Sequence, residues 1–279
     1  MTAMDSSTPT LAAINRPIRP ADLTAAKARG ERWPMLTCYD VLTARVFDAH
    51  RIPALLVGDS AAMVVHGHQS TVAITVGELL PLVAAVRRGV QRALIVADLP
   101  FGSYEDSPSQ ALATAKRFLK VGGAAAVKFE GGAGFAGHVH HLVSAGIPVM
   151  GHIGLLPQSV NALGGYPVQG RGTAAAAILA DAHAIADAGA FALVIEAVPA
   201  DLGRQVATAL GIPVIGIGAG PGTDAQILVW QDLLGLTPAP TPRFVPRYAD
   251  LAGTIGEAIS RWANDVADGT YPGIEHCYS

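Results

Sequence analysis

The chain has 279 residues, of which 51% are hydrophobic and only 6% are aromatic, and its formal net charge at pH 7 is −3. This length and composition predict one large core filled mainly by small and aliphatic side chains, as in an α/β barrel. No dense run of Lys or Arg occurs, so the charge pattern argues against nucleic acid or an anionic membrane as a partner.

Two features of the sequence predict a cytoplasmic protein. Cys38 and Cys277 lie far apart and form neither a disulfide framework nor a Cys-x-x-Cys zinc motif. The N-terminus lacks a basic segment followed by an apolar one, and no apolar run is long enough to cross a bilayer. We therefore expect small molecules to be the partners, and neither a membrane nor nucleic acid.

Residues 1–18 are rich in Ser, Thr, Pro and Ala without a period, which predicts a flexible tail. Residues 19–279 contain no break in composition that marks a linker, so they predict a single domain that ends in an amphipathic helix. The segments with helical periodicity and helix-ending residues are 20–30, 40–50, 77–91, 109–121, 134–146, 173–189, 199–210, 224–235 and 249–268.

Apolar runs of strand length alternate with these helices, and most of them end in a polar or charged residue. The clear runs are 35–40, 52–60, 93–98, 124–130, 147–152, 191–196 and 212–217, and 243–247 is a weak eighth candidate. Polar residues at the carboxyl ends of successive buried parallel strands predict a (β/α)8 TIM barrel with its active site at that end. An open doubly wound sheet is the alternative, but it concentrates such residues near one switch point.

Three of these strands end in a carboxylate, at Asp59, Asp98 and Glu130. Brought together without a cation, the three would repel each other strongly. A hard divalent cation resolves this repulsion, and all-oxygen ligation suits Mg²⁺. The sequence therefore predicts a magnesium site, with the alternative that the carboxylates face helix N-termini or separate partners.

Lys128 lies two residues before Glu130, so the two side chains point to the same side of their strand. An ammonium at this place can hold a substrate carboxylate or a developing oxyanion. The alternative role, a Schiff-base lysine, needs a neutral amine, and neighbouring carboxylates favour the charged form.

Glu196 and His152 end two further strands. Glu196 follows an apolar run and is the candidate general base for removing a proton from carbon. Alternatively, it caps a helix or pairs with an arginine such as Arg171. His152 is a candidate to bind substrate or to orient the base, and a structural role is the alternative.

Ten stretches of the sequence, in order over nearly the whole chain beyond the tail, resemble the ketopantoate hydroxymethyltransferase family. They are LTCYD at 36–40, LLVGDS at 55–60, ADLPF at 97–101, VKFEGG at 127–132, GHIG at 151–154, PQSVN at 157–161, GGY at 164–166, VQGRG at 168–172, IPVIGIGAG at 212–220 and YPGIEH at 271–276. The resemblance implies a (β/α)8 barrel of the phosphoenolpyruvate/isocitrate-lyase type.

The resemblance also implies roles for the site residues. Mg²⁺ would be held by Asp59, Asp98 and Glu130, and the substrate would be contacted by Asp59, Ser60, Asp98 and Lys128. Glu196 would accept the C3 proton of 3-methyl-2-oxobutanoate, giving an enolate stabilised by the metal. The enolate would attack the methylene group of the co-substrate 5,10-methylenetetrahydrofolate and yield 2-dehydropantoate for pantothenate synthesis. Family members commonly form homo-decamers, so we expect a homo-decamer.

Several loop residues depart from the family's pattern. Gln69 stands where Asp is common, Leu156 where Thr is usual, and Pro167 where Lys or Arg is usual. At Pro221-Gly222 the usual Asp-Gly-Gln segment is interrupted. We expect these loops at the barrel top, where they would tune the use of substrate or folate. Two competing functions remain. One is a C–C lyase of the same superfamily, which usually needs a catalytic loop cysteine, and the other is a paralogue that is non-catalytic or has an altered substrate.

Overall fold

The protein is described here from a computed structural model that places residues 9–238 and 240–279. They fall into two compact units, Met1–Val229 and Trp230–Ser279. That residues 19–279 form a single domain stays a prediction. Within the described residues, no helix is long and apolar enough to cross a membrane.

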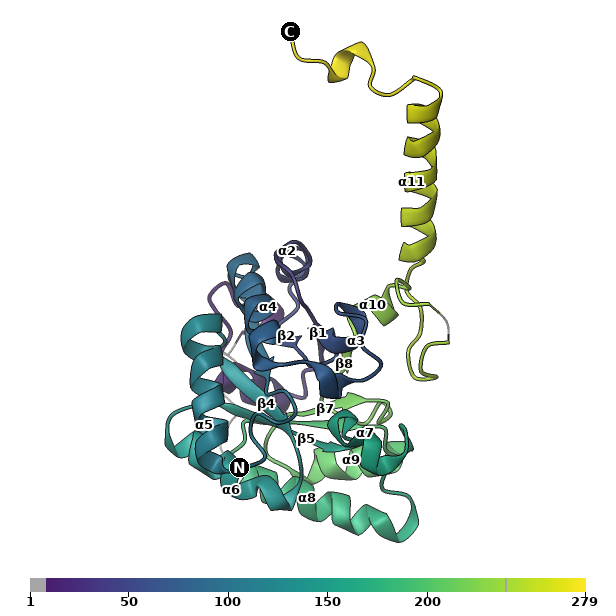
Figure 1. The fold of residues 1–279 in the computed structure, drawn as a ribbon. Coiled ribbons are helices and arrows are strands. Elements are labelled where there is room, and N and C mark those ends of the chain that lie inside the picture. Colours follow the sequence, from purple (N-terminus) through teal and green to yellow (C-terminus); the bar gives the residue numbers. More distant parts are fainter. Residues whose placement is uncertain (1–8, 239) are drawn as a thin grey trace. The chain divides into compact units, whose positions relative to one another are not determined.

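The first unit contains a closed barrel of parallel strands, which confirms the predicted fold class (Figure 1). Spatial order follows chain order, and the first strand pairs with the last to close the barrel. The strands are β1 (Trp33–Thr37), β2 (Ala54–Val57), β3 (Leu94–Asp98), β4 (Ala126–Glu130), β5 (Val149–Gly154), β6 (Ala192–Glu196), β7 (Val214–Ile217) and β8 (Ala225–Leu228).

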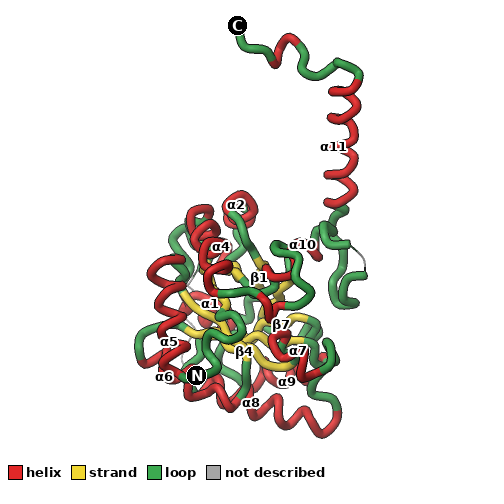
Figure 2. Tube along the Cα trace, viewed as in Figure 1, coloured by secondary structure: helices red, strands yellow, loops and turns green. Residues whose placement is uncertain are grey.

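Helices surround these strands, as Figure 2 shows. The helices of the first unit are α1 (Pro20–Ala28), α2 (Val41–Ala49), α3 (Ala61–Val64), α4 (Val76–Gly89), α5 (Pro108–Arg117), α6 (Ala136–Ser144), α7 (Val160–Leu163), α8 (Ala175–Asp187) and α9 (Ala200–Ala209). The second unit has α10 (Trp230–Leu233) and α11 (Leu251–Ala267).

Several of the barrel helices begin at a side chain that caps them. The Asp40 carboxylate accepts hydrogen bonds from the backbone N–H groups of Leu42 and Thr43 at the start of α2. Thr75 and Glu78 form a reciprocal capping box at the start of α4. These local signals fix where the helices begin.

The eighth strand is formed by Ala225–Leu228, so the prediction of a strand at 243–247 is wrong, and the predicted helix over 224–235 is confirmed only at Trp230–Leu233. The strand pairs with β7 and β1. The connection from β7 contains no helix, and it packs closely along α9, with Gly220 against Ala200 and Gly222 against Arg204. Because this strand has only four residues and no helix separates it from β7, the sequence shows no periodic pattern that would predict it.

The prediction of a loose tail is wrong for residues 11–18, while residues 1–8 lie outside the described residues. Leu11, Ile14 and Ile18 are at most 5% exposed and belong to the barrel's core cluster. That cluster includes the first residues of several strands, such as Ala54, so the segment closes the amino end of the barrel. The Leu11 carbonyl also accepts a hydrogen bond from Arg92 at 3.0 Å.

We predict that Leu11→Ala lowers the free energy of unfolding by about 2–4 kcal/mol, because it empties a buried site. The matched control is the exposed neighbour Thr10→Ala, for which the expected change is within about 0.5 kcal/mol. Urea denaturation followed by circular dichroism measures both. Equal small effects for the two variants would mean that the segment does not contribute to the core.

Candidate active site

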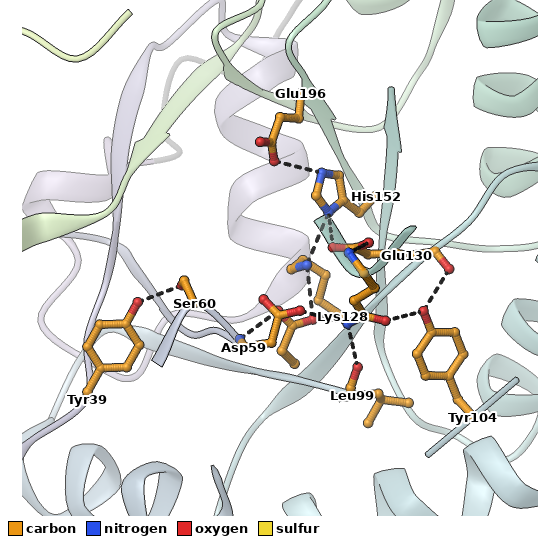
Figure 3. A network of polar contacts seen from close by, with 11 residues as sticks. Tyr39, Asp59, Ser60, Leu99, Tyr104, Lys128, Glu130, His152 and Glu196 are labelled. Atoms are coloured by element: carbon orange, nitrogen blue, oxygen red, sulfur yellow. Dashed lines mark hydrogen bonds and ion pairs between the residues drawn. The ribbon is translucent and has the colours of Figure 1, made fainter. Parts of the chain in front are cut away.

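The carboxyl ends of five neighbouring strands bring the predicted site residues into one polar network (Figure 3). Its members are Asp59 and Ser60 after β2, Asp98 on β3, Lys128 and Glu130 on β4, His152 on β5 and Glu196 on β6. Strand pairing sets their alignment, since Asp98 is in register with Lys128, and Glu130 with His152. All are buried except Ser60 and Glu196, which are partly exposed.

Lys128 is the positive centre of the network. Its Nζ lies 3.0 Å from Asp98 Oδ1 and 3.2 Å from His152 Nδ1. Burial lowers the pKa of this amine, but the surrounding carboxylates, Asp98 foremost, outweigh burial and raise the pKa well above its usual range. Lys128 is therefore an ammonium, suited to hold an anionic oxygen and unsuited to act as a Schiff-base nucleophile.

The carboxylates Asp59 and Asp98 lie side by side, and the Asp59 backbone N–H donates to Asp98 Oδ2 at 3.2 Å. Burial is the main cause that raises the pKa of both carboxyl groups above the usual value. The negative charges of Asp98 and Glu130 raise the pKa of Asp59 further, while Lys128 lowers it. Asp59 and Asp98 are therefore two neighbouring buried carboxyl groups, and added positive charge would stabilise their ionised forms.

The oxygens of this cluster fit a hard divalent cation, although the carboxylates do not surround one point. Among residues 9–238 and 240–279, no three Asp, Glu, His or Cys side chains are arranged as a complete metal-binding group. Asp98 Oδ1 and Glu130 Oε1 are nevertheless buried without a hydrogen bond, and their charge contacts are with Lys128 and His152. Buried carboxylate oxygens with unused acceptor capacity are the ligands that Mg²⁺ prefers.

His152 connects this cluster to Glu196. Its Nε2 lies 3.2 Å from Glu196 Oε2, and its Nδ1 lies 3.5 Å from Glu130 Oε1. Burial and Lys128 lower the pKa of the imidazole, but hydrogen bonds to Glu130 and Glu196 raise it overall to about 9. His152 therefore orients Glu196, which pairs with it and not, within the described chain, with Arg171.

Two residues outside the predicted set hold the network in place. The Tyr39 hydroxyl lies 2.7 Å from Ser60 Oγ and fixes that hydroxyl beside Asp59. Gln158 donates to Asp59 Oδ2 at 2.8 Å through its side chain and to Glu130 Oε2 at 3.0 Å through its backbone. Both lie in stretches that resemble the family, LTCYD and PQSVN, but neither ends a strand in a charge, the signal used to choose candidates.

The residues that depart from the family's pattern fall in two places. Gln69 follows the carboxyl end of β2, and Leu156 and Pro167 follow that of β5, as expected for the barrel top. Gly222 instead lies against Arg204, one turn into α9. This contact does not test whether Pro221-Gly222, in the connection after the carboxyl end of β7, faces the site, and the effect of all four departures on substrate or folate use stays a prediction.

Comparison with known proteins gives a consistent result. The profile of a family described as ketopantoate hydroxymethyltransferase matches residues 17–274. Relatives named 3-methyl-2-oxobutanoate hydroxymethyltransferase include one from Saccharopolyspora erythraea, 59% identical over 94% of this chain and 90% of the relative. The relative from Frankia alni is 61% identical over 92% and 85%, and that from Thermobifida fusca is 56% identical over 99% and 100%.

Solved structures extend the likeness of the fold. The chain superposes on phosphoenolpyruvate phosphomutase from Streptomyces platensis subsp. rosaceus with a TM-score of 0.59, at 18% identity, over 94% of this chain and 92% of that one. It superposes on 2,3-dimethylmalate lyase, of the PEP mutase/isocitrate lyase superfamily, with a TM-score of 0.58, at 18% identity, over 93% and 91%. The barrel is thus of the type found in that superfamily.

We predict a pH-dependent contribution of His152 to stability in protein treated with a chelator. Because its pKa is about 9 in the folded chain and about 6.5 when unfolded, its stabilising effect is full below pH 6.5 and is lost as pH rises through 9. The difference in free energy of unfolding between wild type and His152→Gln should shrink by roughly 3 kcal/mol over that range. A difference that stays constant with pH would contradict this assignment.

Proposed function

The chain belongs to the ketopantoate hydroxymethyltransferase family, and on that premise we propose that it converts 3-methyl-2-oxobutanoate into 2-dehydropantoate with Mg²⁺ and 5,10-methylenetetrahydrofolate. The family makes the chain a hydroxymethyltransferase, a one-carbon transferase of pantothenate biosynthesis. The observation that carries the proposal is the continuous contact from Lys128 across His152 to Glu196. This contact supports an anion-binding role for Lys128 and the role of base for Glu196 in one site.

The substrate is a 2-oxo acid, so the site must hold a carboxylate and a keto oxygen that gains negative charge. Lys128 provides a buried ammonium for these oxygens, and Ser60, fixed by Tyr39, provides a hydroxyl donor next to Asp59. Mg²⁺ held by Asp59, Asp98 and Glu130 would supply a Lewis acid that further stabilises the negative charge. The substrate is thereby prepared to lose its C3 proton.

Glu196 is the group that would accept this proton. Its carboxylate is partly exposed and directed by the His152 imidazole, so one oxygen is held while the carboxylate stays open to the site. Loss of the proton puts negative charge on the keto oxygen, near the ammonium of Lys128. The carbanion then forms a C–C bond to the folate methylene carbon as one of that carbon's two C–N bonds breaks, and water displaces the second nitrogen and supplies the hydroxyl oxygen. The two nitrogens take up the proton from Glu196 and one proton of this water, which releases tetrahydrofolate.

The competing lyase function is less well supported. Cys38 is fully buried, and its thiol lies 3.4 Å from Thr43 Oγ1. Burial raises its pKa to about 11, so it is a neutral structural thiol. Cys277, the other cysteine, belongs to the second unit, near the end of the chain. A non-catalytic paralogue would have lost the base or the carboxylates, whereas this chain keeps Glu196, Asp59 and Asp98.

We infer a homo-decamer in the cytoplasm. Helix α11 carries apolar side chains on one face, at Ile255, Ile259, Trp262 and Val266, and each is at least 45% exposed. An amphipathic helix with an exposed apolar face is typical of a segment that packs against another chain. The two cysteines, both free, suit a reducing compartment.

We predict that Glu196→Gln lowers the rate of 2-dehydropantoate formation by roughly 10²–10⁴-fold, because it removes the general base while keeping its shape. Binding of 3-methyl-2-oxobutanoate in the presence of Mg²⁺, measured by calorimetry, should change little. The control is Glu257→Gln on the exposed surface of α11, which should leave the rate unchanged. Full activity of Glu196→Gln would remove the residue from the proposed role.

The assembly is tested by light scattering coupled to size-exclusion chromatography. We predict the mass of ten chains of 28.6 kDa each. Trp262→Asp should shift the mass to smaller species, since it places a charge on the apolar face of α11. A wild type that elutes as a monomer would contradict the proposed assembly.

A further inference from the structure

Gln158 reaches from its own loop to the ends of three other strands. It lies in a single helical turn, Pro157–Ser159, after β5, and only 5% of its surface is exposed. A buried neutral amide among carboxylates has no part in the proton transfer derived above. Its contacts therefore call for a separate explanation.

On its donor side, Gln158 binds two of the carboxylates at once. The side-chain nitrogen donates to Asp59 Oδ2 at 2.8 Å and to the Leu99 carbonyl at 3.1 Å, and the backbone N–H donates to Glu130 Oε2 at 3.0 Å. Both neighbours of the side-chain nitrogen are acceptors, so the amide cannot be turned over without placing oxygen against oxygen. The orientation of Gln158 is thereby fixed.

On its acceptor side, Gln158 is held by Tyr104. The Tyr104 hydroxyl donates to Gln158 Oε1 at 2.7 Å and also lies 3.1 Å from the Glu130 carbonyl. Its ring is 2% exposed and packs against Phe129 and Phe135, with centroid distances of 5.2 and 5.6 Å. The buried Tyr104 ring thus holds its hydroxyl against the side-chain amide of Gln158, and that amide in turn binds the Asp59 carboxylate.

We propose that Gln158, clamped by Tyr104, is a positioning residue that sets the placement of Asp59 and Glu130 for the divalent cation. The assignment rests on the proposed function, which includes that cation. A neutral donor is suited to this task, because it holds two buried carboxylates without a positive charge that would repel the ion. It also binds only one oxygen of Glu130, and the other oxygen, Oε1, faces His152 Nδ1 at 3.5 Å.

The test measures the binding of Mn²⁺, used as a substitute for Mg²⁺, to chelator-treated full-length protein. The concentration of the free ion is followed by electron paramagnetic resonance. Gln158→Leu keeps the volume and removes the side-chain donor and acceptor, and the expected loss of Mn²⁺ affinity is about 10–100-fold. The matched control is Gln91→Leu, an exposed glutamine at the amino end of β3, where the affinity should not change.

Tyr104→Phe provides a second, gentler variant, because it keeps the packed ring and removes only the hydroxyl. It should weaken Mn²⁺ binding in the same direction by a smaller factor. The double variant should bind no more weakly than Gln158→Leu alone, since both changes break one network. If Gln158→Leu does not show the circular dichroism spectrum and the mass of the wild type, it is not correctly folded, and the test then uses Tyr104→Phe alone.

The outcomes separate this inference from the proposed function. If wild type binds Mn²⁺ and the folded variants bind it as tightly or more tightly, the positioning role is overturned while the proposed function stands. If wild type does not bind Mn²⁺, the metal-dependent function fails and the positioning role fails with it. Loss of affinity in the variants alone, with thermal stability near that of wild type, supports the inference.

Discussion

Like charges are buried together at the carboxyl ends of β2, β3 and β4, and the rest of the site depends on how they are compensated. Three carboxylates taken out of water repel each other and lose solvation, which costs several kcal/mol per ion in general. Lys128 supplies the internal positive charge, 3.0 Å from Asp98. Gln158 supplies neutral donors. The negative charge of the cluster is only partly compensated in this way. The cluster is therefore stable in the folded chain and still favours binding of a cation and, at Lys128, of an anionic substrate.

The barrel makes this arrangement possible because its two ends are built for different tasks. The amino end is packed with apolar residues, including Leu11 and Ile18 from the segment before the first helix. The carboxyl end receives one or two polar side chains from each of the strands β2 to β6, held in register by backbone hydrogen bonds. Strand ends are more rigid than loops, so the distance from Lys128 to Glu196 through His152 is fixed by the fold.

Those parts of the fold and site that rest on repeated patterns were predictable from the sequence. Apolar runs located seven strands, because burial of both faces of a parallel strand leaves a continuous apolar signal, and the polar or charged residues that end most of these runs located the polar network. The strand Ala225–Leu228 and the segment 11–18 were missed, because the first is short and not followed by a full helix and the second hides its apolar residues among Pro and Ala. Gln158 was missed because its role comes from tertiary contacts, which no local pattern encodes. The family resemblance contained its stretch but did not give its role.

The central claim is that the buried charges and Glu196 form one site for removing a proton from carbon. The most direct test is nuclear magnetic resonance of 3-methyl-2-oxobutanoate with the wild-type protein in deuterated water, with Mg²⁺ and without folate. The account predicts loss of the C3 proton signal as deuterium is incorporated, and no loss when the metal is chelated. A C3 signal that persists with Mg²⁺, under conditions where the substrate is bound, would contradict it.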